Sequence, residues 1–357
     1  MECLSKNNLE LSKQDNQMAK GLAVLSMVAL HLFCRLENLP YTPIIYINNI
    51  PLVYYLGLFG DICVPIYCFC SGYAQYLLIE REKKQYFFET KRRIFRFVRH
   101  FWVVLLIFSF LGILLGRQEV IPGTLEKFLG NVFLYNLNYN GAWWFILTYI
   151  FLLLLSKGLY QIVSRIYWLL TIILFSAVYV VAYIFRFRCA IFFDHTVINW
   201  IWAQAILVGT SLLPYICGMI ARKYEVVAII RRKSLLLKRK LVNMLLFGVI
   251  LGLFLLHSVI QSLIIAVVTG LGTLLCFYVW NKGTKAKTFF LFWGKHSTNI
   301  WLSHMFFYMV LFPDLVFKAK YPILIYLFML LLCLIASYTI NCLERLLILG
   351  RKSICRI

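Results

Sequence analysis

The sequence is poor in acidic residues: 14 Asp and Glu stand against 36 Lys and Arg in 357 residues, a formal net charge of +22 at pH 7. All charged residues together make up 14% of the chain, whereas hydrophobic residues make up 62%. In an average soluble domain, about a quarter of the residues are charged. This shortage of charge excludes a soluble globular protein and indicates a chain that crosses a membrane several times.

Other common patterns are also missing. The 11 cysteines contain no C-x-x-C pair, a spacing on which many metal and redox sites are built. Most of them lie in apolar segments, so we interpret them as core residues and expect neither a metal nor disulfides. No basic run alternates with polar or stacking aromatic residues in a soluble module, which argues against a nucleic-acid partner. We do not expect the polar first 19 residues to form a cleavable leader.

Ten apolar segments are long enough to span a bilayer, and they predict an all-α membrane bundle of about ten transmembrane helices. The loops predicted to share one side carry about four times as many Lys and Arg as the opposite loops, so we expect both termini in the cytoplasm. The predicted spans are 20–36, 54–79, 94–116, 142–160, 166–185, 200–221, 241–257, 260–281, 289–312 and 323–343.

No soluble module, repeat or low-complexity tract interrupts these spans. We therefore interpret residues 1–357 as a single membrane domain, surrounded by membrane lipids. It has a cytoplasmic N-terminal segment (1–19), a transmembrane bundle (20–343) and a cytoplasmic tail (344–357).

Two of the predicted external loops are long. Residues 37–53 contain three prolines and are expected to form an ordered, extended loop. Residues 117–141 contain an amphipathic stretch at 126–135. This stretch is expected to be an interfacial helix, either packed on the bundle or re-entrant near an acceptor site.

The first span carries a histidine eleven residues after a lysine, Lys20 and His31. At about 100° and 1.5 Å per residue, the two side chains return to nearly the same face, roughly 16 Å apart. An ionisable group at that depth in a membrane is costly and usually marks a functional site. The alternative is a histidine that only forms a hydrogen bond to a neighbouring helix.

A stripe of arginines enters the third predicted span. Arg93, Arg96 and Arg99 recur every three residues, after Lys91 and Arg92. Anchoring at the cytoplasmic surface explains Lys91 and Arg92. It does not explain Arg96 and Arg99, which continue into the apolar segment, although the long side chain of Arg96 could still reach back to the surface. Because one guanidinium group can donate two parallel hydrogen bonds to the oxygens of a phosphate, the stripe is typical of a site for a phosphate-bearing ligand.

Two polar features fall in the second span. Asp61 is expected either to pair with His31, which would orient the imidazole, or to cap a helix near Pro65. Ser71 lies in the small step Cys70-Ser71-Gly72-Tyr73, where helix backbones can approach closely. No Gly-x-Ser-x-Gly surrounds Ser71, so we interpret it as a packing residue rather than a nucleophile.

Later in the chain, Trp143 and Trp144 are placed at an outer interface, where they form an aromatic belt or a platform for stacking a sugar. In the ninth span, His304 lies deep in an apolar segment. It is a second candidate polar site, unless it makes only a structural hydrogen bond.

Taken in order, these motifs resemble the acyltransferase-3 family of integral membrane acyltransferases, which O-acetylate bacterial surface polysaccharides. The matching elements run through nearly the whole chain. They are Lys20-Gly-Leu-Ala with His31, Pro65-Ile-Tyr-Cys-Phe-Cys-Ser-Gly-Tyr73, Arg92-Arg93-Ile-Phe-Arg96, Trp144-Phe145, Ile300-Trp-Leu-Ser-His304 and Glu344-Arg345.

The resemblance implies a multi-pass O-acetyltransferase of the bacterial cytoplasmic membrane. His31 would be the catalytic base or transient acyl carrier, with Lys20 along the same route, and Arg93 and Arg96 would hold acetyl-CoA. From their own positions in the sequence, we add Asp61 as a third catalytic candidate and Arg92 and Arg99 as further candidates for binding acetyl-CoA. The acceptor would be a hydroxyl of a cell-surface or lipid-linked glycan. Ser71, Tyr73, Trp144, His304 and Glu344 are the expected supporting or substrate-contacting residues.

Three departures from the family pattern affect these expectations. No proline follows soon after Arg96. Where the family has an arginine, this chain has Lys20, whose ammonium group is a point charge and lacks the paired N–H donors of a guanidinium group. No esterase-like domain accompanies the bundle, so the acyl group is expected to pass directly to the acceptor or to a separate envelope-biosynthesis partner.

Two other functions use the same residues. A transporter or flippase for a lipid-linked glycan or anionic solute would line its route with these cations and histidines, but the sequence shows no inverted repeats to support it. A regulatory membrane module without chemistry would tolerate the loss of Lys20 and His31.

Overall fold

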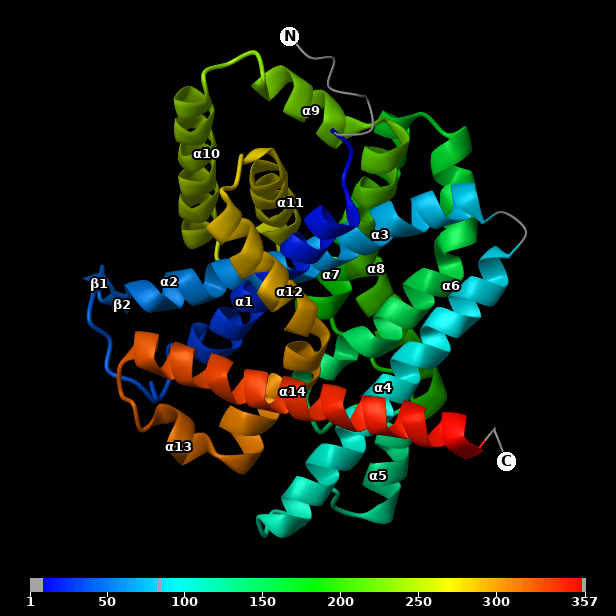
Figure 1. Cartoon of the computed structure of the whole chain (residues 1–357), viewed down its shortest axis with the longest axis vertical. Coiled ribbons are helices and arrows are strands. Elements are labelled where there is room, and N and C mark those ends of the chain that lie inside the picture. Colours follow the sequence, from blue (N-terminus) through cyan, green and yellow to red (C-terminus); the bar gives the residue numbers. More distant parts are fainter. Residues whose placement is uncertain (1–8, 83–84, 355–357) are drawn as a thin grey trace. The chain divides into compact units, whose positions relative to one another are not determined.

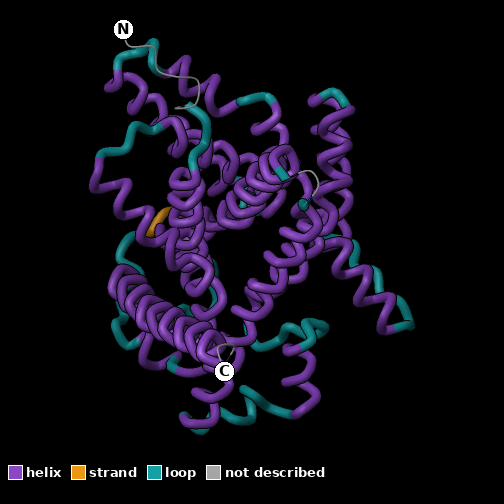
Figure 2. The backbone as a smooth tube through the Cα atoms, turned by 45° about the vertical axis from the view of Figure 1, so that its right-hand side comes forward, coloured by secondary structure: helices purple, strands orange, loops and turns teal. Residues whose placement is uncertain are grey.

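The computed structural model describes residues 9–82 and 85–354, with backbone only for 347–354. Parts of the predicted segments 1–19 and 344–357 therefore lie outside the described residues, as do the loop cations Lys6, Lys83, Lys84 and Arg356. Most of the described backbone is helical, with a single two-stranded hairpin among the described residues (Figure 2). The predicted all-α fold is confirmed.

The elements are labelled in Figure 1. The short ones are the strands β1 (Tyr46–Ile47) and β2 (Ile50–Pro51), the 3₁₀ helices η2 (Phe59–Ile62) and η3 (Gly141–Trp143), and the π-helix η4 (Phe306–Leu311). The α-helices are α1 (Lys13–Phe33), α2 (Leu52–Leu58), α3 (Cys63–Arg81), α4 (Tyr86–Leu114), α5 (Leu125–Val132), α6 (Trp144–Arg165), α7 (Trp168–Phe187), α8 (Thr196–Lys223), α9 (Val226–Ser234), α10 (Arg239–Val259), α11 (Leu263–Val279), α12 (Thr284–Met305), α13 (Pro313–Phe317) and α14 (Pro322–Ile354).

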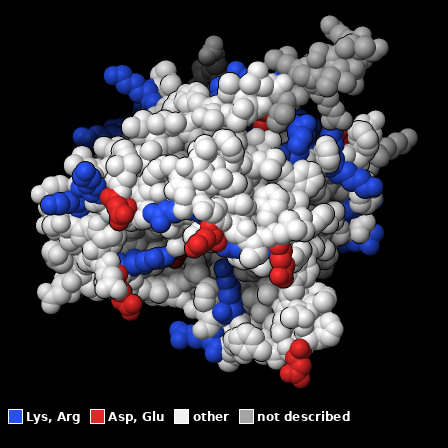
Figure 3. All heavy atoms as spheres, turned by 90° about the horizontal axis from the view of Figure 1, so that it is seen from below, with Lys and Arg blue, Asp and Glu red and all other residues white. Residues whose placement is uncertain are grey.

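Seven helical segments of the described chain are long and apolar enough to cross a membrane, and they match seven of the ten predicted spans. The other three predictions also fall on helices. α11 is apolar but has only 17 residues, whereas α1 and α12 are long enough and more polar. Figure 3 shows one face of the molecule, where charged side chains are scattered among other residues. Which side the termini face stays a prediction.

Local sequence explains where α1 begins. The Ser12 hydroxyl accepts a hydrogen bond from the backbone N–H of Asp15, and the Asp15 carboxylate accepts one from the N–H of Ser12. This reciprocal capping box satisfies two N–H groups that the first turn of a helix leaves unpaired. Asp15 also forms an ion pair with Arg231 of α9, at 2.9 Å.

The loop after α1, whose prolines predict an ordered, extended segment, ends in a two-residue hairpin. In this hairpin Tyr46 pairs with Pro51 and Ile47 pairs with Ile50. Asn48 and Asn49 connect the strands, both with positive φ. Asparagine tolerates this left-handed conformation, which a tight two-residue hairpin requires.

The described chain divides into two compact units. The first comprises the residues up to Leu30, Gly57–Phe87 and Phe145–Lys295, and the second comprises His31–Leu56, Phe88–Trp144 and the residues from His296 onward. In the first unit, α8 packs on α3 and α7, and α11 packs on α3 and α10. The core of the second unit centres on Trp143, whose ring contacts Phe101 and Phe306.

Glycine allows the closest helix approach in the first unit. A Cβ at Gly72 of α3 would meet the carbonyl oxygen of Tyr215, and one at Gly218 of α8 would meet that of Phe69, both well inside van der Waals contact. The two backbones therefore touch where a side chain could not fit. The predicted close approach at Cys70-Ser71-Gly72-Tyr73 is confirmed.

This crossing generates a stability prediction. Gly218→Ala forces a methyl group between α8 and α3, so we expect it to lower the free energy of unfolding by about 1–3 kcal/mol. Gly248→Ala is the matched control, because Gly248 also lies within a helix but has no neighbouring atom within 4 Å of an added Cβ. There the gain in helix propensity should leave stability unchanged or slightly raised. Thermal unfolding of both detergent-purified variants measures the difference, and equal midpoints would contradict the crossing.

Candidate active site

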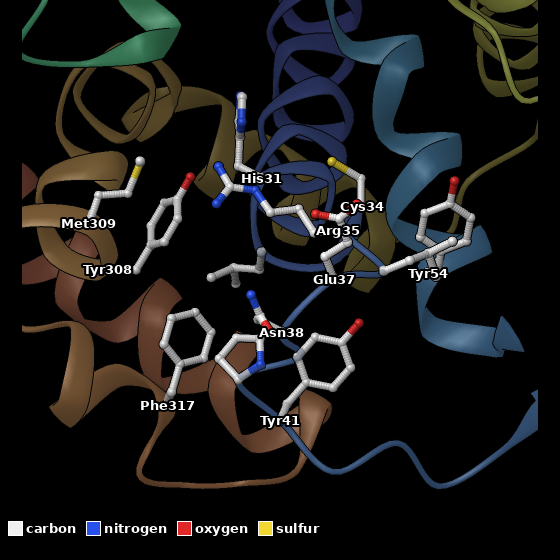
Figure 4. A pocket seen from close by; sticks show the side chains of 13 residues that line it. His31, Cys34, Arg35, Glu37, Asn38, Tyr41, Tyr54, Tyr308, Met309 and Phe317 are labelled. Carbon is white, nitrogen blue, oxygen red and sulfur yellow. The ribbon is translucent and has the colours of Figure 1, made fainter.

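A cavity of about 620 Å³ lies in the second unit, at the C-terminal end of α1. Its walls come from the last turn of α1, the following loop, α2, η4 and α13. Figure 4 shows its side chains, which include His31 and a mixture of polar and aromatic groups. The histidine predicted from the Lys20–His31 spacing therefore has space beside it in which a ligand can bind.

His31 meets the second predicted histidine, His304 of α12. Their ring centroids are 4.9 Å apart and the planes are inclined by 44°. His31 is half-buried, whereas His304 is 1% exposed. The structure thus brings together two ionisable rings that sequence reasoning treated as separate candidates.

The hydrogen bonds of His304 determine which of its nitrogens carries the proton. Nδ1 lies 3.1 Å from the carbonyl oxygen of Ile300 and 3.0 Å from that of Trp301. Carbonyl oxygens only accept hydrogen bonds, so Nδ1 is the donor and the neutral ring keeps a lone pair on Nε2. That Nε2 is buried and has no hydrogen-bond partner among the described residues. His304 therefore offers an unused acceptor in the neighbourhood of His31.

The helix geometry changes just after His304. α12 ends at Met305 and continues as the π-helix η4, which supplies Tyr308 and Met309 to the cavity wall. π-helical turns are rare and are found frequently at functional sites. Their wider turn alters the faces on which successive side chains lie, here next to the histidine pair.

Lys20 lies on α1 eleven residues before His31, as predicted, in the part of the helix that belongs to the first unit. The glycine that follows it has a packing role. A Cβ at Gly21 would collide with the carbonyl oxygen of Phe290 in α12, so glycine lets the two helices touch there.

Asp61 has a different neighbour from the one expected. It lies in η2, and its Oδ2 is 3.6 Å from Nε2 of His257, a buried residue at the end of α10. The Nδ1 of His257 lies 3.0 Å from the hydroxyl of Thr269. The capping alternative is not seen either, because the N-terminus of α3 has no side-chain cap. The sequence offered no signal for His257, which it placed in an outer turn.

The arginine stripe lies on α4, in the second unit. Arg92 is exposed and forms a loose ion pair with Glu89, at 3.7 Å. Among the described carboxylates, none lies within 4 Å of Arg93, Arg96 or Arg99, so these three charges are not neutralised by an ion pair. None of them lines the cavity beside His31. They remain candidates for holding phosphates at a different place from the cavity.

A polar network that sequence reasoning missed connects α4 to α12 and α14. Nδ1 of His100 lies 2.8 Å from the Glu344 carboxylate, and Nε2 lies 2.6 Å from Oδ1 of Asn299. The Asn299 amide is oriented by its N–H, which donates to the carbonyl oxygen of Ser337. Both nitrogens of His100 therefore lie within hydrogen-bond distance of an oxygen atom, one from a carboxylate and one from an amide. Glu344 was expected only through the family resemblance, and its partner is 244 residues away.

The remaining predicted residues are spread over the chain. Ser71 and Tyr73 lie on α3 in the first unit, on either side of Gly72. Trp144 is half-buried at the start of α6. The belt prediction is wrong for Trp143, which is fully buried and donates a hydrogen bond from its indole N–H to the carbonyl oxygen of Leu302. In the part of the chain that the structure describes, no cluster of His, Cys, Asp and Glu is suited to hold a metal.

The His100–Glu344 pair can be tested by its stability. Glu344→Ala removes the carboxylate partner of the mostly buried His100 side chain, so we expect unfolding to become easier by about 1–3 kcal/mol. Glu89→Ala is the control, because it breaks the exposed pair with Arg92 and should cost less than about 1 kcal/mol. Thermal unfolding of the purified variants gives both values. A Glu344→Ala protein as stable as Glu89→Ala would show that the His100 ring does not depend on this carboxylate.

Comparison with known proteins supports the assignment suggested by the motifs. The acyltransferase-3 family model, described as an acyltransferase domain, matches residues 17–342. No curated protein and no solved structure matches the chain. The matched range contains Lys20, His31, the arginines of α4 and His304, in an all-α, multi-pass membrane fold. The chain therefore belongs to the acyltransferase-3 family of membrane acyltransferases.

Proposed function

We propose that this membrane acyltransferase moves an acetyl group from acetyl-CoA to a hydroxyl of a cell-surface or lipid-linked polysaccharide, in a bacterial cytoplasmic membrane. The observation that carries the proposal is the position of His31, which lines a cavity and lies against His304. A positioned imidazole next to space for a ligand is suited to accept a proton from an attacking hydroxyl.

His304 acts in this scheme as the group that orients His31. Its Nε2 lone pair is an acceptor without a partner in the described chain. A hydrogen bond from one nitrogen of His31 to this lone pair would fix the His31 tautomer and leave the other nitrogen free as the base. The acidic member of a catalytic triad orients its histidine in the same way.

In direct transfer, His31 takes the proton of the acceptor hydroxyl while the oxygen attacks the thioester carbonyl carbon. The C–O bond forms, the C–S bond breaks, and the CoA thiolate leaves with the proton that His31 has accepted. In the stepwise alternative, the imidazole attacks first and releases the thiolate, and the acceptor hydroxyl then removes the acetyl group from the ring. Either route places the acetyl group on the glycan and regenerates His31.

The donor would bind through its phosphates at α4. Arg93, Arg96 and Arg99 have no carboxylate partner in the described chain, which supports a role toward an anion. Arg92, which pairs loosely with Glu89, would add charge at the rim. In the predicted topology these residues face the cytoplasm, where acetyl-CoA is found, and the cavity at the opposite end of α1 would take the acceptor.

The role of His31 can be tested with purified protein. His31→Gln keeps a hydrogen-bonding side chain of similar size but cannot accept a proton or carry an acetyl group. We expect it to abolish transfer from radiolabelled acetyl-CoA to envelope glycan, with at least a roughly hundredfold loss of rate. His195→Gln, on the exposed loop before α8, is the control and should keep the wild-type rate.

Three further outcomes separate the alternatives. Undiminished transfer by His31→Gln would refute the assignment of the base. If wild-type protein in vesicles takes up solute and leaves the thioester intact, the protein is a transporter. An acetyl group trapped on His31 after rapid quenching identifies the stepwise route.

The donor site predicts a selective defect in substrate binding. Replacing both Arg93 and Arg96 by Gln should raise the KM for acetyl-CoA by roughly tenfold or more, because charge-assisted contacts to phosphate are lost. The KM for S-acetylpantetheine, which lacks the nucleotide phosphates, should stay near its wild-type value. Arg117→Gln serves as a control on the predicted opposite side. An equal increase of the KM for both donors would show that these arginines do not bind the nucleotide phosphates.

A further inference from the structure

The cavity contains a cation that neither the motifs nor the proposed reaction uses. Arg35 follows the end of α1, four residues after His31, and lines the cavity. Figure 4 shows its side chain turned back, with the guanidinium beside the hydroxyl end of Tyr308 and close to His31. Its charge is near enough to act on both of these rings.

No described carboxylate neutralises Arg35. The ion pairs of the described chain do not include it, and Glu37, which lines the same cavity, does not come within 4 Å of its guanidinium. A guanidinium group offers a flat fork of N–H donors that matches a carboxylate or phosphate. The fork of Arg35 therefore remains available to a ligand in the cavity.

Two hydroxyl groups of tyrosines that line the cavity also lack partners. The hydroxyls of Tyr41 and Tyr308 are buried and make no hydrogen bond to any described residue, and each residue is only 6% exposed. Tyr308 lies beside the Arg35 guanidinium, and Tyr41 lies on another side of the cavity (Figure 4). Because buried polar atoms are nearly always satisfied, these two hydroxyls point to a polar ligand. Tyr54 and Phe317 add aromatic surface, against which the apolar face of a sugar ring can pack.

We infer that the cavity selects an acidic acceptor. Arg35 binds the carboxylate or phosphate of a negatively charged sugar unit, the hydroxyls of Tyr41 and Tyr308 bind its polar groups, and a neighbouring hydroxyl is thereby presented to His31. Arg35 is then a specificity-determining residue, and the preferred glycan carries uronic acid or phosphorylated sugars. The inference rests on the proposed function, because it names the substrate class of that same site.

The test compares acceptors that differ only in charge. The full-length detergent-purified protein is given methyl glucuronide or methyl glucoside, and in a second pair glucose 6-phosphate or glucose, with radiolabelled acetyl-CoA. We expect kcat/KM to be roughly 10- to 100-fold higher for the charged member of at least one pair, the range typical of a charge-assisted hydrogen bond. The pair with the larger ratio tells whether a carboxylate or a phosphate is recognised.

Three variants identify the cause of the preference. Arg35→Gln should bring the ratio close to one by slowing only the charged acceptor, and Arg35→Lys should keep part of it. Glu37→Gln, which removes the opposite charge from the same cavity, should preserve or increase the ratio. Transfer to the neutral acceptor, measured on the same preparation of each variant, is the reference rate, so a general loss of activity leaves the ratio unchanged and is not mistaken for a loss of charge preference.

A parallel binding measurement separates failure of this inference from failure of the proposed function. Titration of the same sugars is followed by intrinsic tryptophan fluorescence, without acetyl-CoA. If the wild-type protein binds charged sugars more tightly than neutral ones and Arg35→Gln loses this difference, the inference is supported. If the same protein transfers no acetyl group, only the proposed reaction fails. Equal affinity for charged and neutral sugars, no binding of either, or an equal loss of both in Arg35→Gln overturns the inference.

Discussion

The contact between His31 and His304 is the constraint on which the rest of the site depends. Two ionisable rings, one on α1 and one on α12, meet at a distance of 4.9 Å between their centroids. Because the Nδ1 of His304 is committed to backbone carbonyls, its Nε2 can only accept a hydrogen bond. The pair therefore contains an unused acceptor and, next to it, a half-buried imidazole that opens on a cavity. Such unsatisfied polarity is costly in a membrane and is retained where it serves chemistry.

α12 organises the polar groups of the second unit. Its C-terminal part carries Asn299, which orients His100 toward Glu344, and His304, which lies against His31. The π-helix that follows brings Tyr308 to the cavity wall. One helix thus takes part in two polar arrangements, the network of Asn299, His100 and Glu344 that connects it to α4 and α14, and a histidine pair at the cavity. In the proposed reaction, His100 of the first arrangement lies on α4, the helix whose arginines bind the donor. The histidine pair lies where the acceptor binds.

Sequence reasoning was most successful where one segment carries the whole signal. The all-α fold, the helical regions and the Lys20–His31 spacing follow from apolar periodicity along single helices. The small step at Gly72 correctly indicated a close approach, although the partner helix α8 could not be named. Predictions that depended on which residues from different segments contact each other were less successful. Asp61 faces His257, Trp143 is a core residue, and the His100–Glu344 pair was not foreseen.

The sequence alone determined which helices form and which of them carry ionisable groups, because helix periodicity and the cost of charge in an apolar segment are local properties. Only the tertiary structure decided which of those groups meet. His31 and His304 are 273 residues apart, and nothing in either segment specifies how α1 is rotated relative to α12. That rotation is set by packing of backbone against backbone and ring against ring, which brings His31, Arg35, Tyr41 and Tyr308 around one cavity.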